Sequence, residues 1–264
     1  MAQLGVNVAA GGLIPVPVLS DLGVRVVRLV AYPSSNDFTY LDQLRRAGIR
    51  RWLILASESF SGFSSWGAAI DEYHRRYGSL VDVWQLGNEP DQPGHSSWDM
   101  SPQDFTGLLW TGRDRLPTRY LVAGGLHSGN PYWLNNVNLD WVNGIAVHPY
   151  GQLPPGQYDP GWYFGHVDNL LWNYRNYLNS SGRGDKHLHV SEWGGPVRDW
   201  DWDENRHGAY IGYMSKWFRS TSLVGDAIMF CASDAMVSPF GLMRADGSKR
   251  PAWFEYQATC RGWW

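Results

Sequence analysis

Hydrophobic positions along the chain form short runs that alternate with segments of helical spacing. The runs are rich in β-branched and aromatic residues, as buried strands are, and in each following segment the apolar positions recur every three to four residues. The runs predict strands at residues 4–8, 24–30, 51–57, 81–87, 120–126, 144–150, 186–195 and 227–232. The intervening segments predict helices at residues 15–22, 39–47, 65–77, 132–141, 166–178, 204–220 and 252–260, with a further helix beginning at residue 101.

This alternation predicts the fold class. Parallel strands need a crossover connection, usually a helix, so repeated strand–helix units indicate a parallel sheet. Eight units close a (β/α)8 barrel, and the 264 residues suit one such domain covering residues 1–264. The alternative is an open doubly wound sheet, which would carry a glycine-rich phosphate loop after an early strand. Residues 10–13 match that loop poorly, so we predict the α/β barrel.

Polar and aromatic side chains stand where the predicted strands end. In (β/α)8 barrels the chemistry gathers at this carboxyl end. The residues concerned are Asn7, Arg28, Glu58, Asn88, Glu89, His127, His148, Tyr150, Glu192, Trp193, Ser233 and Asp234. Glu89 and Glu192 each terminate a strongly apolar strand, where a charge needs a partner or a function. Pro90 is expected to restrict Glu89 to an extended backbone.

The two glutamates and one arginine form the candidate site. Strands four and seven of a barrel lie nearly opposite each other, so Glu89 and Glu192 can face each other across the mouth. Arg25 and Arg28 have opposite parity on the second strand, so one of them faces an interior. Arg28 is nearer the carboxyl end and is the candidate partner of a carboxylate, the alternative being a surface arginine lying along the protein. Two facing carboxylates suit cleavage of a glycosidic bond.

Composition narrows the classes of function. Hydrophobic residues make up 44% and charged residues 18%, as in globular proteins. The net charge of -3, without basic runs, argues against a nucleic-acid partner. No apolar stretch of membrane-spanning length occurs, and the two cysteines, Cys231 and Cys260, are expected to be buried free thiols. The 16 Trp and 14 Tyr favour a carbohydrate ligand, because aromatic faces stack on sugar rings.

Several short motifs together resemble a known group of enzymes. The motifs at strands four and seven resemble those of the retaining glycoside hydrolases of clan A, and residues 240–243 and 249–253 are similar to the last barrel unit of family 39-like members. The matching residues are Asn88-Glu89-Pro90, Ser191-Glu192-Trp193-Gly194, Arg28 and His148-Pro149-Tyr150. The resemblance spans the whole chain. The Asn-Glu-Pro tripeptide alone would be weak evidence, but with the second glutamate, Glu192, at the expected strand it becomes strong evidence.

The resemblance implies a role for each matching residue. Glu89 would be the general acid/base, keeping its proton if it is partly desolvated, and Glu192 would be the nucleophile. Asn88 would bind the sugar 2-hydroxyl, while Arg28 and Tyr150 would hold Glu192 ionised and aimed. Clan members commonly have a tryptophan on strand eight as the floor of the cleavage subsite. Here Phe230 stands in that place, and we expect Trp193 to supply the missing surface.

Other residues are expected to contact the saccharide from the rim. They are His127, His148, Trp98 and Trp162, the last of which belongs to a predicted loop at 151–165 that also carries Tyr158 and Tyr163. The expected partner is a polysaccharide or oligosaccharide substrate, cleaved by endo action on a β-linked chain by a monomer without cofactor, metal or membrane contact. The substrate class favours an extracellular location, although residues 1–5 carry no secretion signal.

Two other functions are compatible with the same sequence. The first is a barrel that binds carbohydrate without cleaving it. The second is a metal-dependent hydrolase, in which His127, His148 and the glutamates would bind zinc. The only His-x-His motif, His187-x-His189, lies at the start of strand seven and away from the mouth, which disfavours this second possibility.

Overall fold

Eight parallel strands close into a barrel in the computed structural model, which describes residues 1–9, 14–92, 100–127, 129–150 and 160–263. Each strand pairs in parallel with its sequence neighbours, and β8 pairs with β1 to close the ring. The strands are β1 (Gln3–Asn7), β2 (Val26–Val30), β3 (Arg50–Leu55), β4 (Val83–Leu86), β5 (Leu121–Leu126), β6 (Gly144–Val147), β7 (His187–Trp193) and β8 (Asp226–Met229). The predicted (β/α)8 barrel is confirmed.

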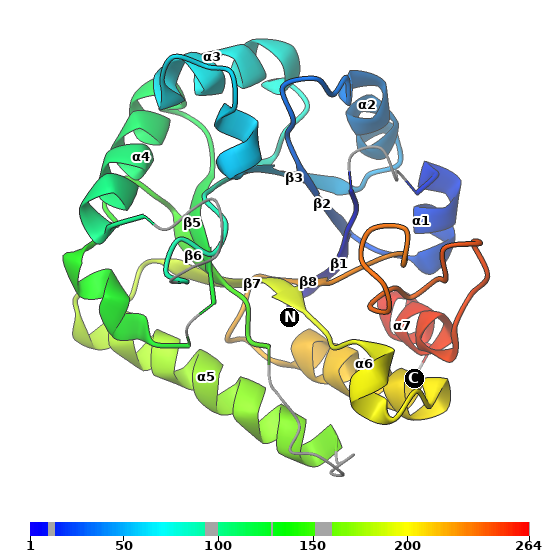
Figure 1. Ribbon diagram of the computed structural model, residues 1–264. Coiled ribbons are helices and arrows are strands. Elements are labelled where there is room, and N and C mark those ends of the chain that lie inside the picture. Colours follow the sequence, from blue (N-terminus) through cyan, green and yellow to red (C-terminus); the bar gives the residue numbers. More distant parts are fainter. Residues whose placement is uncertain (10–13, 93–99, 128, 151–159, 264) are drawn as a thin grey trace.

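The helices surround the strands as an outer ring (Figure 1). The α-helices are α1 (Val16–Leu22), α2 (Phe38–Arg46), α3 (Trp66–Tyr77), α4 (Pro102–Arg115), α5 (Pro160–Ser180), α6 (Glu204–Ser220) and α7 (Pro251–Arg261). The part of the chain that the structure describes also contains three short 3-10 helices, η1 (Ser57–Phe60), η2 (Pro131–Asn136) and η3 (Val197–Trp200). None of the helices in the described residues has the length and hydrophobicity needed to cross a bilayer.

Two predicted boundaries are wrong. The segment after β5, predicted as a helix at 132–141, forms only the 3-10 helix η2. Helix α5 begins at Pro160 and not at residue 166, so the predicted loop at 151–165 already ends inside the helix. Tyr163, expected in that loop, is 3% exposed and donates its hydroxyl to the carbonyl of Gly194. It therefore packs inside the protein.

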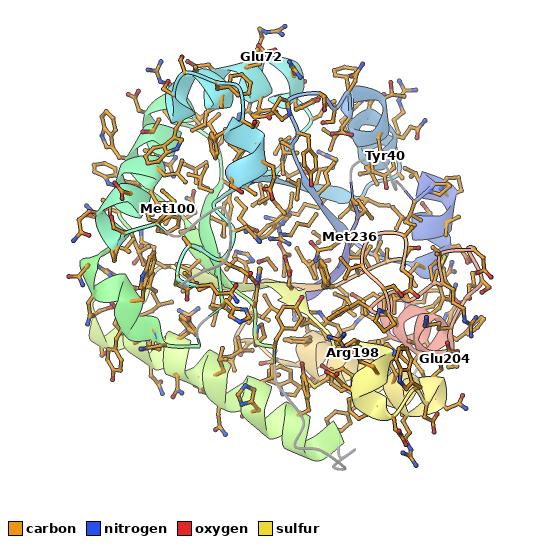
Figure 2. The ribbon with its side chains drawn as sticks, viewed as in Figure 1. Tyr40, Glu72, Met100, Arg198, Glu204 and Met236 are labelled. Atoms are coloured by element: carbon orange, nitrogen blue, oxygen red, sulfur yellow. The ribbon has the colours of Figure 1, made fainter. Side chains whose placement is uncertain are left out.

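Side chains fill both the barrel and the layer between strands and helices (Figure 2). The larger hydrophobic cluster joins the outer faces of the strands to the helices. The smaller cluster plugs the barrel interior, where the indole of Trp52 is surrounded by smaller residues. Its members are Val26, Trp52, Val83, Val122, Ala146 and Ile228. This plug lies below the carboxyl ends of the strands, so the polar side chains at those ends stand on a rigid floor.

Candidate active site

Glu89 occupies a strained turn after β4. Its φ of 51° lies in the left-handed region, which is uncommon for a residue other than glycine. The expectation of an extended backbone at Glu89 is therefore wrong. Its amide N–H donates to the carbonyl of Gly125 at 2.9 Å, and its own carbonyl accepts from Gln92 at 3.2 Å, so both sides of the turn are fixed. Strain of this kind costs about 1–3 kcal/mol and clusters at functional sites.

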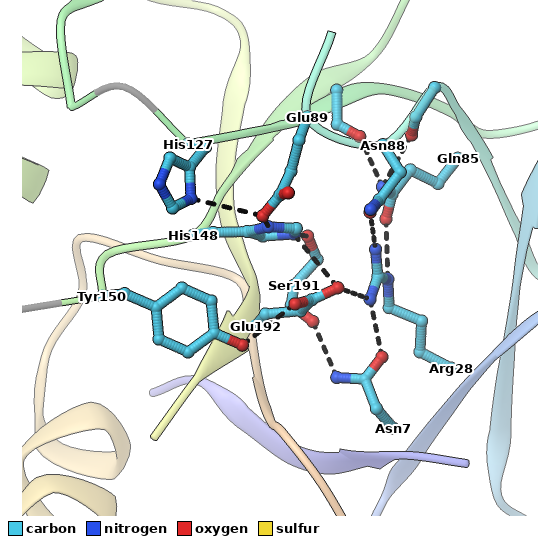
Figure 3. A network of polar contacts seen from close by, with 12 residues as sticks. Asn7, Arg28, Gln85, Asn88, Glu89, His127, His148, Tyr150, Ser191 and Glu192 are labelled. Atoms are coloured by element: carbon cyan, nitrogen blue, oxygen red, sulfur yellow. Dashed lines mark hydrogen bonds and ion pairs between the residues drawn. The ribbon is translucent and has the colours of Figure 1, made fainter. Parts of the chain in front are cut away.

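Glu192 reaches the same region from β7. The pairing of β7 with β8 shifts register between Val190 and Trp193, and such an irregularity breaks the regular alternation of inward and outward side chains. As a result the consecutive residues Ser191 and Glu192 both take part in the network at the barrel mouth (Figure 3).

Arg28 is the centre of this network. Its side chain is 1% exposed, so it is buried in the barrel and does not lie along the surface. Nη1 donates to Glu192 Oε1 at 2.7 Å, which pairs the buried cation with an anion. The guanidinium also donates to three neutral acceptors, which are Asn7 Oδ1 at 2.6 Å, Gln85 Oε1 at 2.9 Å and Asn88 Oδ1 at 2.8 Å. A planar guanidinium with this many fixed acceptors holds the carboxylate of Glu192 in one position.

Tyr150 engages the other oxygen of Glu192. Its hydroxyl donates to Glu192 Oε2 at 2.9 Å. Burial, followed by the charge of Glu192, raises the pKa of Tyr150 well above its ordinary value. The phenol therefore keeps its proton at any working pH. Each carboxylate oxygen of Glu192 accepts at least one hydrogen bond, one from a cation and one from a neutral donor.

Glu89 lies between two imidazoles. His148 Nδ1 is 2.8 Å and His127 Nδ1 is 3.3 Å from Glu89 Oε1 (Figure 3). Burial raises the pKa of Glu89, but its contacts with the imidazoles of His127 and His148 lower it more, so its net pKa lies below the ordinary value. The expectation that desolvation leaves the proton on Glu89 is wrong for this arrangement. The contact with Glu89 also raises the pKa of His127.

His148 bridges the two carboxylates. Besides its contact with Glu89, its Nε2 is 3.0 Å from Ser191 Oγ and 3.5 Å from Glu192 Oε1. Since an ionised carboxylate only accepts hydrogen bonds, Nδ1 carries a proton toward Glu89. The side chain of His148 has 0% exposure, so it acts on the carboxylates and does not contact a substrate, contrary to the prediction.

The two carboxylates are close together. One oxygen of Glu89, one of Glu192 and a ring nitrogen of His148 all lie within 4.8 Å of one another. These distances alone would suit a metal ion. However, the Arg28 guanidinium and the Tyr150 hydroxyl already donate to the two oxygens of Glu192. A metal cation bound there would have to displace the hydroxyl of Tyr150 and would be repelled by the positive charge of Arg28. The donor set therefore does not fit a metal site.

The fold was compared with solved structures. The chain is 16% identical to a glucosidase from Croceicoccus marinus, with a TM-score of 0.76 over 99% of this chain and 68% of that one. A GH128 endo-β-1,3-glucanase from Amycolatopsis mediterranei, in complex with laminaritriose, is 16% identical, with a TM-score of 0.68 over 98% of this chain and 100% of that one. The GH39 enzyme from Xanthomonas axonopodis pv. citri is 19% identical, with a TM-score of 0.69 over 97% and 65%.

This chain has the fold of these glycoside hydrolases. At such identities the likeness shows the fold, and the chain spans about two thirds of the glucosidase and of the GH39 enzyme. No family model matches the sequence, and no curated protein matches it either. The resemblance to clan A and family 39 inferred from the motifs agrees with these structures.

Trp193 does not form part of the candidate site. It is 1% exposed and packs its ring against Phe218 of α6 and Tyr256 of α7, at centroid distances of 5.0 and 6.0 Å. The prediction that it supplies a sugar-binding surface is wrong, because the residue after the inward-facing Glu192 points outward to the helices. Phe230 directly follows β8, is partly exposed and contacts the ring of Phe240 at 5.6 Å. Its role as subsite floor stays a prediction.

Two predicted rim residues cannot be placed. Trp98 and the side chain of Trp162 lie outside the described residues.

Asn88 is partly buried, and since its Oδ1 accepts from Arg28, its amide NH2 group can donate to a ligand. His127 lies at the end of β5 with 37% of its side chain exposed.

The structure adds residues that were not predicted. Gln85 is fully buried, accepts from Arg28 and donates to the carbonyls of Gly87 and Gly124. The alternation of the strand was the available signal, because Gln85 and Gly87 are two residues apart and therefore lie on the same face, which points into the barrel. Ser191 holds the ring of His148, but no sequence pattern distinguishes it from an ordinary strand serine.

Proposed function

We propose that this protein is a retaining glycoside hydrolase that cleaves a β-linked polysaccharide or oligosaccharide. The observation that carries the proposal is the pair of buried carboxylates, Glu89 and Glu192, with oxygens within 4.8 Å of each other. Carboxyl groups about 5–5.5 Å apart are typical of retaining enzymes, whereas inverting enzymes separate them by roughly 6.5–9.5 Å to admit a water molecule.

The two carboxylates have environments that suit different steps. The guanidinium of Arg28 and the hydroxyl of Tyr150 each donate a hydrogen bond to Glu192, and together they orient its carboxylate for nucleophilic attack. It attacks the anomeric carbon while Glu89 donates a proton to the leaving oxygen, which gives a glycosyl ester on Glu192 and a free alcohol. In the second step Glu89 takes a proton from water, and the resulting hydroxide displaces the sugar from Glu192. The amide NH2 of Asn88 binds the sugar 2-hydroxyl.

The mode of action rests on one structural neighbour. The endo-β-1,3-glucanase matches 98% of this chain with 100% of its own length. This supports endo action on a β-linked chain. The identity of the sugar and its linkage would be found by incubating the protein with an array of polysaccharides and analysing the products by mass spectrometry.

Substitution of each glutamate tests the assignment of roles. Glu192→Ala should abolish turnover, and azide should restore part of it by attacking the open anomeric face to give a glycosyl azide of the opposite anomer. Glu89→Ala should retain activity on aryl glycosides with good leaving groups and lose it on those with poor ones, because only the latter need a proton. Glu58→Ala is a matched control, since Glu58 is an exposed carboxylate in η1 at the same end of the barrel.

Three outcomes would contradict the proposal. Saccharide binding without hydrolysis by the unmodified protein would indicate a carbohydrate-binding barrel. Loss of hydrolysis on treatment with EDTA, restored by zinc, would indicate the metal-dependent alternative. Inversion of anomeric configuration, followed by NMR of the first products formed, would show that the two carboxylates act on a water molecule and not through a covalent intermediate.

A further inference from the structure

The proposed reaction needs a proton on Glu89, but the structure holds this carboxyl group ionised. Its net pKa lies below the ordinary value because two imidazoles place their Nδ1 atoms 2.8 Å and 3.3 Å from Oε1. An acid catalyst must carry a proton when the leaving group departs. The proton must therefore be kept close by and reach Glu89 during the reaction.

His127 has the geometry to keep that proton. It follows β5 directly, and its backbone N–H donates to Asp91 Oδ1 at 2.9 Å, which fixes its position at the rim. Its Nδ1 is buried, makes no hydrogen bond of ideal geometry and lies 3.3 Å from Glu89 Oε1, while 37% of the side chain is exposed. One ring therefore joins the buried carboxylate to the solvent. A proton on this ring equilibrates with bulk water and is also within reach of Glu89.

His148 cannot take this role. Its side chain has 0% exposure, and its two ring nitrogens face Glu89 Oε1 at 2.8 Å and Ser191 Oγ at 3.0 Å. With both nitrogens engaged inside the protein, its ring has no direct contact with water. The two histidines beside Glu89 thus differ in their access to water, and only His127 connects the carboxyl group to it.

We propose that His127 is a positioning residue that stores the proton delivered by Glu89, an inference that rests on the proposed hydrolase function. In the resting site the ring is an imidazolium and Glu89 is a carboxylate. As the glycosidic bond breaks, Nδ1–H passes its proton to Glu89 Oε1 and Glu89 passes it to the leaving oxygen. In the second step Glu89 takes a proton from the attacking water and returns it to Nδ1. The cycle consumes no net proton.

Other charged and titratable groups around this pair bear on its titration. They are Asp91 in the segment after β4, His148 and Tyr150 after β6, Glu192 on β7 and Arg28 on β2. Glu89, then Asp91 and Glu192, favour the charged form of His127, whereas burial of the ring opposes it. The net pKa of His127 is raised, so the stored proton is lost only above the ordinary range of a histidine.

The pH dependence of kcat/KM tests this role. In the unmodified enzyme the basic limb should report loss of the shared proton from the coupled pair, at an apparent pKa above about 6.5. In His127→Gln the proton is held by the carboxyl group alone, so the apparent pKa of the basic limb should fall by about one unit or more. At a pH above that limb, kcat/KM should then be at least tenfold lower than in the unmodified enzyme. Added imidazole should restore the limb in His127→Ala. His187→Gln, at the opposite end of the barrel, is the control and should leave the profile unchanged.

A titration without substrate gives an independent measurement. The ring signals of His127, followed by NMR against pH, should have a midpoint above about 6.5, and Glu89→Gln should lower this midpoint. An unchanged midpoint in Glu89→Gln, or an unchanged basic limb in an active His127→Gln, would overturn the inference while leaving the hydrolase proposal intact. Absence of hydrolysis by the unmodified protein would overturn the proposed function, and this inference with it.

Discussion

The ion pair between Arg28 and Glu192 should contribute more to stability than any surface pair of this protein. Arg28→Met keeps the length of the side chain but removes the cation, leaving a carboxylate that is 11% exposed without its charged partner. Breaking a buried pair in this way costs about 3–5 kcal/mol. Glu192→Gln should cost less, because the amide oxygen can still accept from Nη1.

The double variant separates the pair from its surroundings. Arg28→Met with Glu192→Gln leaves no unpaired charge, so its cost should fall below the sum of the single costs by about 2–3 kcal/mol. Urea unfolding at one pH, followed by tryptophan fluorescence, gives the four free energies of unfolding. As a control, the same cycle on Arg75 and Glu72 should give a coupling below about 0.5 kcal/mol, because Arg75 is 71% exposed.

The result that would refute this reasoning is additivity. If the two single costs at Arg28 and Glu192 sum to that of the double variant within about 0.5 kcal/mol, the contact at 2.7 Å carries no coupling energy. The guanidinium would then be held by its neutral acceptors alone. The orientation of the Glu192 carboxylate would then depend on the hydrogen bond from Tyr150.

Two further predictions concern Tyr150 and His189. Tyr150→Phe removes a hydrogen bond to a charged oxygen, so kcat/KM should fall by about 10- to 100-fold in protein that is still folded at the assay temperature, and a change below about twofold would contradict this role. Burial lowers the pKa of His189 to about 3, and Asp226 N–H donates to its Nδ1, which requires a neutral ring. Below about pH 6.5 only the unfolded chain protonates this histidine, so stability should fall by about 2 kcal/mol on going to pH 5. His189→Asn should lack that part of the pH dependence in urea titrations, and an equal dependence in both proteins would contradict it.

The barrel and its charged centre were accessible from the sequence because they follow from periodicity. Strand–helix alternation predicts the closed sheet, and the parity of β2 places Arg28 inside it. The same two-residue repeat places the side chain of Gln85 inside the barrel, where it accepts a hydrogen bond from Arg28. Such inferences hold wherever each side chain follows the two-residue repeat of a strand.

What was missed depends on contacts between distant segments. The left-handed turn at Glu89 is fixed by a hydrogen bond to Gly125, 36 positions along the chain, and local preference before a proline points the other way. Trp193 was misjudged because its neighbour Glu192 faces inward, and the next residue then faces the helices. The low pKa of Glu89 requires two histidines from other strands, which no local pattern reveals.

Gly125 shows how little room the mouth of the barrel leaves for change. Its φ is 107°, and a Cβ there would lie 2.7 Å from His148 Nε2 and 3.1 Å from Gln85 Nε2. Any larger residue would push apart the imidazole that serves Glu89 and the amide that serves Arg28. Only the hydrogen atom of a glycine side chain fits between these two groups. Attempts to change the chemistry of the site by mutation should therefore begin at the outer loops and leave Gly125 unchanged.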